Sequence, residues 1–316
     1  MTKRQAQQET TSTFRIALHP RYWLVAIGLV LLRLITLLPF RILLLIGKLV
    51  GRLLYLTANE RRQVAETNIG LCFPELEKPD VKQLTKSTFE SVGIAMLETP
   101  LSWWASNTRL KPLVHIEGLE HIIKAKQQGR GVLLLGAHFT CLEIGGRLLA
   151  MHEPTVNMYK KHRNRLFEAV MRKNRTKHLG GLIQRHDVRN FVRTLNQGKV
   201  CWIAPDQDFG RKNTVFVPFM GIPAATLTAT ARIAKMSNAV VIPFFPTRRK
   251  DASGYDLAIM PALENFPSGD DIKDATRVNQ VIAEHVKLAP DQYLWLHRRF
   301  KTRPEGDPDL YSTRHT

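Results

Sequence analysis

The hydrophobic positions along this chain of 316 residues fall into two regimes. Between residues 22 and 57, leucine, isoleucine and valine dominate with few polar interruptions, whereas after residue 58 short apolar runs alternate with amphipathic stretches. Pro39 lies within the first regime and predicts a kink or a break in any helix there. The pattern therefore predicts two parts: a polar N-terminus with a hydrophobic membrane anchor at 1–58, and a globular domain at 59–316.

The first regime has the features of a membrane attachment. Residues 1–13 are polar and predicted to be disordered. Residues 22–38 carry a single charge and are barely long enough to cross a bilayer, so a transmembrane helix and an interfacial helix are both open. Aromatic and basic residues at 19–23 are typical of an anchor at headgroup depth. A buried helix pair is the alternative, but a segment so rich in leucine has no polar side to turn to water. If these residues are helical, with about 100° between successive positions, the basic side chains of the first regime lie on one narrow face of the helix. They are Arg33, Arg41, Lys48 and Arg52.

The second regime predicts alternating strands and helices. A continuous apolar run at 132–135 indicates a strand buried on both faces, and the segments at 155–159, 200–204, 240–246 and 255–260 are also predicted to be strands. Helical spacing is found at 80–98, 119–126 and 271–288, and Asp187 begins a further helix that ends before Gly198. Residues 215–221 and 224–236 are expected to form a loop and then a helix. This alternation predicts an α/β fold with a largely parallel or mixed central sheet flanked by helices.

Charge narrows the set of partners. The chain has 46 Lys and Arg against 27 Asp and Glu, a formal net charge of +19, which implies an anionic partner such as an acidic membrane surface, an acidic protein or a phosphorylated substrate. No nucleic-acid-binding motif is present. Three scattered cysteines indicate neither a disulfide framework nor a zinc site, and they favour a domain facing the cytosol.

The strand at 132–135 leads to the first candidate for catalysis. His138 follows this strand at what would be the carboxyl edge of the sheet, where substrates bind in open α/β folds. Glu143 lies five residues further on, within the first turns of a helix. An imidazole with a carboxylate that orients it can act as a general base. The alternative is a hydrogen-bonded histidine beside an ordinary first-turn acid. Cys141 is a weaker candidate for a nucleophile, because a cysteine between apolar neighbours is usually a small buried hydrophobe.

A second polar loop follows the strand at 200–204. It contains Asp206 and Asp208, whose oxygens are suited to a metal ion, to loop hydrogen bonds or to substrate. No third acid lies nearby in the sequence, so we expect no metal site. A basic run near the C-terminus is either a solvated surface or part of a rim for phosphate or for an acidic protein; it comprises Arg298, Arg299, Lys301 and Arg303. The aromatic residues Trp295, Phe216 and Phe219 are expected in the core.

Several of these stretches together resemble one family, the late lipid A acyltransferases of Gram-negative bacteria within the lysophospholipid acyltransferase superfamily. His138 and Glu143 match the family's His-x4-Asp/Glu signature, and Gly145 and Gly146 fit the residues that follow it. The blocks at 19–23, 204–210, 215–219 and 293–304 are also similar to it. The resemblance extends from about residue 14 to residue 308.

The resemblance implies transfer of a fatty acyl group from acyl carrier protein to a hydroxyl of a 3-hydroxyacyl chain on a lipid A precursor. His138 would take the proton of that hydroxyl, and Glu143 would hold the imidazole. Arg175 would contact phosphate or the tetrahedral oxyanion, and Asp206 and Asp208 would shape the acceptor site. No cofactor is implied, since the thioester is a co-substrate. The enzyme would lie at the bacterial inner membrane, with the acyltransferase domain at 59–316 facing the cytoplasm.

One departure from the family and three rival functions remain. The family usually has Arg-Pro after the strand that ends at residue 159, whereas this chain has Lys160 and Lys161. A lysine keeps the charge but loses the bidentate geometry of arginine, so the resemblance implies no phosphate contact at residue 160. The same His and Glu pair would also suit a glycerophospholipid acyltransferase or an acyl thioesterase. A basic membrane scaffold without catalysis is the rival from another class.

Overall fold

The computed structural model describes residues 13 and 15–312. The polar segment predicted to be disordered, residues 1–13, therefore lies outside the described residues except for Thr13. Within the described chain a seven-stranded sheet runs in the order β1-β9-β8-β2-β5-β3-β4. Its strands are β1 (Val114–Glu117), β2 (Val132–Leu135), β3 (Thr155–Tyr159), β4 (Gly181–Gln184), β5 (Val200–Ile203), β8 (Val240–Arg248) and β9 (Tyr255–Ile259).

The sheet is mixed, which is one of the two predicted arrangements, largely parallel or mixed. Strands β8, β2, β5, β3 and β4 are parallel to one another, while β9 pairs antiparallel with β8 and parallel with β1. All four residues of β2 are buried, as its continuous apolar run predicts for a central strand covered on both faces. The edge strands β1 and β4 were not predicted. They are short and half-exposed, so neither has a long apolar run.

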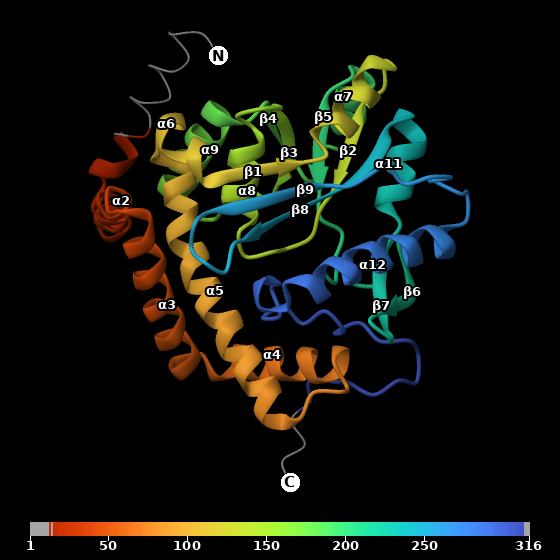
Figure 1. Cartoon of the computed structure of the whole chain (residues 1–316), viewed down its shortest axis with the longest axis horizontal. Helices are drawn as coiled ribbons and strands as arrows, with labels where there is room; N and C mark the ends of the chain where they lie inside the picture. Colours follow the sequence, from red (N-terminus) through yellow and green to blue (C-terminus); the bar gives the residue numbers. More distant parts are fainter. Residues whose placement is uncertain (1–12, 14, 313–316) are drawn as a thin grey trace.

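Helices cover the sheet and extend beyond it (Figure 1). They are α2 (Trp23–Ile35), α3 (Phe40–Thr57), α4 (Asn59–Cys72), α5 (Lys78–Trp104), α6 (Asn107–Leu110), α7 (Leu119–Gln127), α8 (Leu142–Leu149), α9 (Arg165–His178), α10 (Val188–Asn196), α11 (Ala229–Ser237) and α12 (Asp271–Leu288). Asp187 caps α10 by accepting a hydrogen bond from the Asn190 amide at 3.2 Å, as predicted.

One prediction about the second regime is wrong. Residues 214–227 form a β-hairpin rather than a loop followed by a helix, with β6 (Thr214–Phe219) and β7 (Ile222–Leu227) paired antiparallel in a separate two-stranded sheet. The two residues between the strands, Met220 and Gly221, both have positive φ, which is the geometry of a type I′ hairpin turn. The helix α11 starts only at Ala229.

The hydrophobic N-terminal segment forms two helices that separate at Pro39, as predicted. Helix α3 packs closely along α5 because glycines remove the side chains from the contact: a Cβ at Gly51 would lie 2.2 Å from the Phe89 carbonyl oxygen, and one at Gly93 would lie 2.2 Å from that of Gly47. Helix α2 lies at the outer edge of the molecule, next to the start of α3 (Figure 1). Among the described residues, no helix has both the length and the apolar character needed to cross a membrane, so the transmembrane alternative is not found there.

Candidate active site

His138 and Asp206 meet at the carboxyl edge of the sheet. Strands β2 and β5 are parallel neighbours with Leu135 opposite Ile203, and each of the two side chains comes three residues after its strand ends. The His138 ring nitrogen Nδ1 lies 2.7 Å from Asp206 Oδ1. The backbone N–H of His138 donates to the other carboxylate oxygen, Oδ2, at 2.9 Å. One carboxylate therefore fixes both the ring and the main chain of this histidine.

Electrostatics favour the charged form of this pair. Burial alone would lower the pKa of His138, but the negative charge and the hydrogen bond of Asp206 outweigh it, and the pKa is raised. Burial alone would raise the pKa of Asp206, but His138 and the nearby Arg299 lower it to about 2. With Asp206 ionised at neutral pH, Nδ1 carries the proton that is shared with the carboxylate, and Nε2 is left as the basic nitrogen. The His138 side chain is 28% exposed, so a substrate can reach it.

The loop that carries His138 is held by the C-terminal block at 293–304 and the turn before it. The Leu294 amide donates to the His138 carbonyl at 3.0 Å, and the Thr140 amide donates to the Gln292 carbonyl at 2.7 Å. A bridge between Phe139 and Tyr293 lies between these two hydrogen bonds. Helix α8 begins only at Leu142, so His138 lies in this braced loop rather than at the start of the helix.

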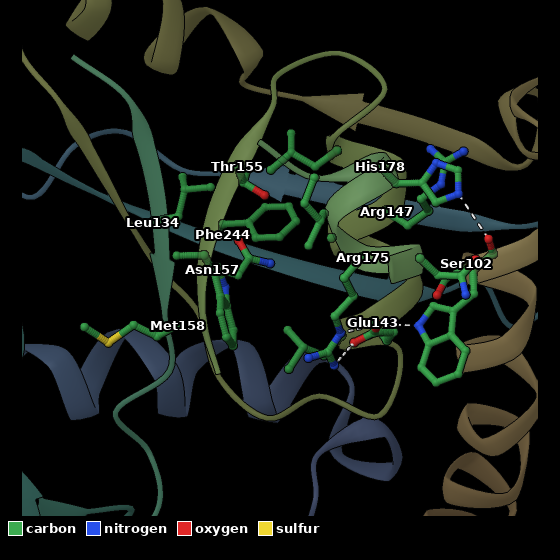
Figure 2. Close-up of a pocket in the computed structure, with 17 residues that line it drawn as sticks. Ser102, Leu134, Glu143, Arg147, Thr155, Asn157, Met158, Arg175, His178 and Phe244 are labelled. Carbon is green, nitrogen blue, oxygen red and sulfur yellow. Dashed lines mark hydrogen bonds and ion pairs between the residues drawn. The ribbon is translucent and has the colours of Figure 1, made fainter. Parts of the chain in front are cut away.

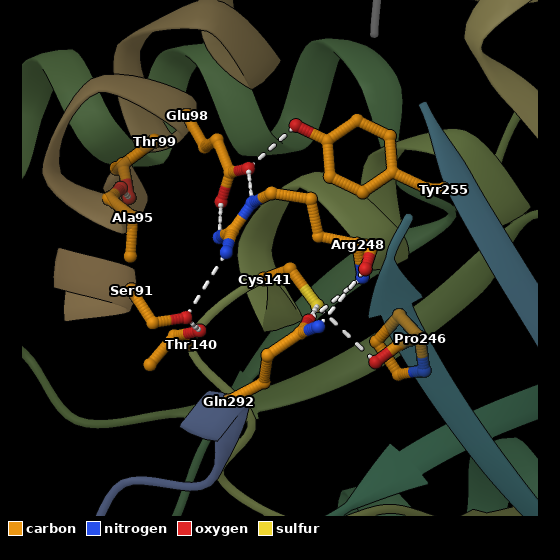
Figure 3. A network of polar contacts seen from close by, with 10 residues as sticks. All are labelled: Ser91, Ala95, Glu98, Thr99, Thr140, Cys141, Pro246, Arg248, Tyr255 and Gln292. Carbon is orange, nitrogen blue, oxygen red and sulfur yellow. Dashed lines mark hydrogen bonds and ion pairs between the residues drawn. The ribbon is translucent and has the colours of Figure 1, made fainter. Parts of the chain in front are cut away.

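A buried polar network lies beside the same loop (Figure 3). The Arg248 guanidinium makes two hydrogen bonds to the Glu98 carboxylate on α5, at 2.6 and 2.7 Å, and a third at 3.0 Å to the Ser91 hydroxyl. Ser91 in turn lies 2.8 Å from the Thr140 hydroxyl. The Gln292 side-chain amide pairs with the main chain of Arg248 at 2.7 and 2.9 Å. The network therefore ties α5, the end of β8 and the loop of His138 together.

Glu143 does not occupy the place expected of it. Its carboxylate accepts two hydrogen bonds from Arg175, at 2.8 and 2.5 Å, and a third from the Trp103 indole N–H at 2.9 Å (Figure 2). The carboxylate that contacts the His138 ring is that of Asp206. Proximity in sequence pointed to Glu143, whereas the parallel pairing of β2 and β5 brings Asp206 to the ring. The signal that was available is that both residues follow buried strands at the same offset.

Glu143 and Arg175 lie among the lining residues of a cavity between α8, α9, α5 and the sheet, which we call the Arg147 pocket (Figure 2). Its volume is about 80 Å³. Apolar side chains such as Leu134 and Phe244 form part of the wall. Polar side chains form the rest and include Arg147, Thr155, Asn157, His178 and Trp202.

The other candidate residues have structural contacts. Asp208 accepts hydrogen bonds from the Thr302 amide and hydroxyl at 2.7 and 2.8 Å, and so joins the second loop to the C-terminal block. Arg299 is buried and donates a hydrogen bond to the Ala225 carbonyl at 2.8 Å, whereas Arg298 and Arg303 pair with Glu60 and Asp307. No group of three or more metal-binding side chains occurs among the described residues.

The remaining cysteine and aromatic residues are packed in the interior. Cys141 is buried, and burial raises the pKa of its thiol to about 12, which makes it a poor nucleophile. Trp295 and Phe219 are buried in the core as predicted, and Phe216 is partly buried.

The fold and these contacts define a class of protein: an α/β enzyme-like domain with an imidazole, oriented by a buried carboxylate, at the carboxyl edge of its sheet. A profile of the family described as bacterial lipid A biosynthesis acyltransferase matches residues 12–302. The chain is 37% identical to the lipid A biosynthesis lauroyltransferase of Escherichia coli (strain K12), and also 37% identical to the lipid A biosynthesis palmitoleoyltransferase of the same strain, each over 93% of this chain and 96% of the relative. A lipid A biosynthesis acyltransferase of Haemophilus influenzae is 38% identical over the same share of both chains. The chain belongs to the bacterial lipid A biosynthesis acyltransferases.

Proposed function

We propose that this acyltransferase moves a fatty acyl group from an acyl-carrier-protein thioester to the hydroxyl of a 3-hydroxyacyl chain on a lipid A precursor, with His138 as the general base. The observation that carries the proposal is the hydrogen bond between His138 Nδ1 and Asp206, because it leaves Nε2 free to accept a proton. Asp206 orients the ring and stabilises the imidazolium that forms. The family identity supplies the reaction class and the lipid acceptor.

In the proposed reaction, His138 accounts for the transfer of the proton from the acceptor hydroxyl to the leaving thiolate. Nε2 of His138 takes the proton of the acceptor hydroxyl while the oxygen attacks the thioester carbonyl. The tetrahedral intermediate collapses with cleavage of the C–S bond, and the proton on His138 passes to the departing thiolate. An ester and the free carrier thiol are the products. Arg175, held by Glu143 and partly exposed, is suited to contact a substrate phosphate or the oxyanion of the intermediate.

The test is transfer from a purified acyl-carrier-protein thioester in the presence of a lipid A precursor, a lysophospholipid and water, with the products identified by mass spectrometry. The proposal expects the acyl chain on the lipid A precursor. Acylated lysophospholipid or free fatty acid as the main product would instead assign the glycerophospholipid acyltransferase or thioesterase alternative. A protein without catalysis would give none of these products above the rate of the uncatalysed reaction.

The pH dependence of the reaction tests which carboxylate acts on His138. Because the base must be neutral and its pKa is raised, kcat/KM should rise with pH through a value above that of an ordinary histidine. In Asp206→Asn the carboxylate that raises the pKa of His138 is gone, and burial lowers that pKa. The acidic limb of the pH–rate profile should therefore move to lower pH, while the maximal rate falls. Glu143→Gln should leave the position of the limb unchanged, since Glu143 pairs with Arg175. A limb that moves with Glu143→Gln and not with Asp206→Asn would contradict this assignment.

We propose that the enzyme attaches to the cytoplasmic face of the inner membrane through α2 and α3, lying in the interface. Large apolar side chains on these helices are exposed, and water alone would be an unfavourable environment for so many of them. They include Trp23, Leu24, Ile27, Leu31, Leu34, Leu45, Leu49, Leu53 and Leu56. The formal net charge of +19 favours an anionic membrane surface.

A charge placed on this apolar surface should release the protein from membranes. Each buried leucine that is lost removes about 1.5–3 kcal/mol of transfer free energy, so Leu24→Asp combined with Leu31→Asp should weaken binding to vesicles with anionic lipids by more than about tenfold. Co-sedimentation with the vesicles measures this. Leu288→Asp is the matched control, because Leu288 is 71% exposed but lies at the end of α12. Equal binding by all three proteins would contradict the attachment.

A further inference from the structure

The Arg147 pocket contains an unusual concentration of unsatisfied polar atoms. Eight buried side-chain nitrogen or oxygen atoms of the described residues have no hydrogen-bond partner. Four of them belong to side chains that line this pocket: Arg147 Nε, Thr155 Oγ1, Asn157 Oδ1 and Trp202 Nε1. A buried polar atom left unpaired costs about 1–3 kcal/mol. Four unpaired atoms on the side chains around one cavity are therefore a feature that the contacts within the chain do not explain.

The charge of the pocket indicates that a ligand bound there would be negatively charged. Arg147 is 4% exposed, and Nη2 donates to the neutral side-chain oxygen of Asn107. No carboxylate among the described residues forms an ion pair with Arg147. Glu143 also lines the pocket, but its charge is balanced by Arg175. The positive charge of Arg147 is therefore uncompensated in a buried setting, which is unfavourable unless an anion binds. The same charge, after burial, helps to lower the pKa of His178, which keeps that imidazole neutral.

The sheet register explains why these groups face one another. Leu134, Trp202 and Asn157 lie side by side on β2, β5 and β3, so their side chains point to the same face of the sheet. Thr155 precedes Asn157 by two residues and shares that face. Helix α8 places Arg147 over them (Figure 2). The indole N–H, the guanidinium N–H and the hydroxyl are donors, and the amide of Asn157 supplies another when its two ends are exchanged.

We propose that the Arg147 pocket is a binding site for a small oxyanion, a carboxylate or a phosphate group, held by Arg147, Trp202 and Thr155. Oxygen atoms that carry negative charge match a set of N–H and O–H donors around one positive charge. Neither His138 nor Asp206 lines this pocket, whereas Arg175, which is proposed above to contact substrate, lies on its wall. The inference does not depend on the identity of the acyl donor or acceptor.

The test is the melting temperature of the full-length protein in detergent micelles, measured with rising inorganic phosphate or octanoate against sodium chloride of equal ionic strength. We expect saturable stabilisation by at least one of the two anions. Thr155→Val removes one donor with little change of shape, and Trp202→Phe removes another together with part of the indole ring. Each should weaken binding of the anion, with the apparent Kd raised by about tenfold. Without anion Thr155→Val should be at least as stable as the wild type, because it removes an unpaired polar atom and keeps the shape of the side chain. Arg189→Gln, on the exposed surface of α10, should respond like the wild type.

The outcomes separate the site from general attraction of anions to a basic protein. Stabilisation lost in both pocket variants and kept in Arg189→Gln supports the site. A response to phosphate alone would assign a phosphate group, and a stronger response to octanoate would assign a carboxylate whose alkyl tail meets the apolar wall. Absence of any saturable response would overturn the proposal, since the pocket would then hold water. An unchanged Kd in both pocket variants would also overturn it.

Discussion

Replacement of His138 by alanine is expected to lower the rate of acyl transfer by about 10²–10⁴-fold, the usual contribution of a positioned general base. The alanine leaves Asp206 without its ion-pair partner and leaves the acceptor hydroxyl without a group to take its proton. Binding of the lipid acceptor involves other residues, so the loss should appear mainly in kcat rather than in KM. The measurement is the rate of product formation by mass spectrometry, with the folded state checked by circular dichroism.

A second histidine variant separates this effect from a general one. His152 is exposed in the turn after α8, and His152→Ala should keep the wild-type rate. Near-normal transfer by His138→Ala would remove His138 from the role of base, even if the lipid A acyltransferase activity itself were confirmed. A loss of the same size in both variants would indicate damage to the fold rather than to the chemistry.

The sequence predicted the elements with strong periodicity and missed the contacts made by distant segments. The strand at 155–159 and the helix at 271–288 were predicted within their observed bounds because a local pattern extends over the whole of each element. The hairpin at 214–227 was missed because its turn is Met220-Gly221, and methionine rarely adopts positive φ. Because no local pattern indicated this turn, a loop and a helix were predicted where the two strands lie.

The same distinction applies to the site. His138 was identified from the strand that precedes it, which is a local signal. Its contact with Asp206 depends on β5 being the neighbour of β2, and the order of strands in a sheet is set by packing of the whole domain. The Glu143–Arg175 pair likewise joins α8 to α9. All four residues of these two pairs were predicted to be in the site, but the pairing of His138 with Asp206 and of Glu143 with Arg175 was not predicted.

The buried Arg248–Glu98 pair carries the largest expected effect on stability. Both side chains are less than a tenth exposed, and the Tyr255 hydroxyl donates a further hydrogen bond to Glu98 at 2.6 Å. Burial would lower the pKa of Arg248, but the charge of Glu98 outweighs it and raises that pKa, so the guanidinium stays charged. Removing one member of such a pair leaves an uncompensated charge in the interior and costs about 3–5 kcal/mol.

Glu98→Gln and Arg248→Met should therefore each lower the melting temperature by roughly 5–15 °C. The double variant should recover part of the loss, because the interior then holds no unpaired charge. Arg249→Met is the matched control: Arg249 is the next residue, but its ion pair with Asp256 is partly exposed and worth less than about 1 kcal/mol. Single variants no less stable than this control would show that solvent or another group compensates the charge. Because the network braces Thr140 next to the loop of His138, the single variants should also lose acyl transfer at temperatures where they remain folded, while Arg249→Met keeps it.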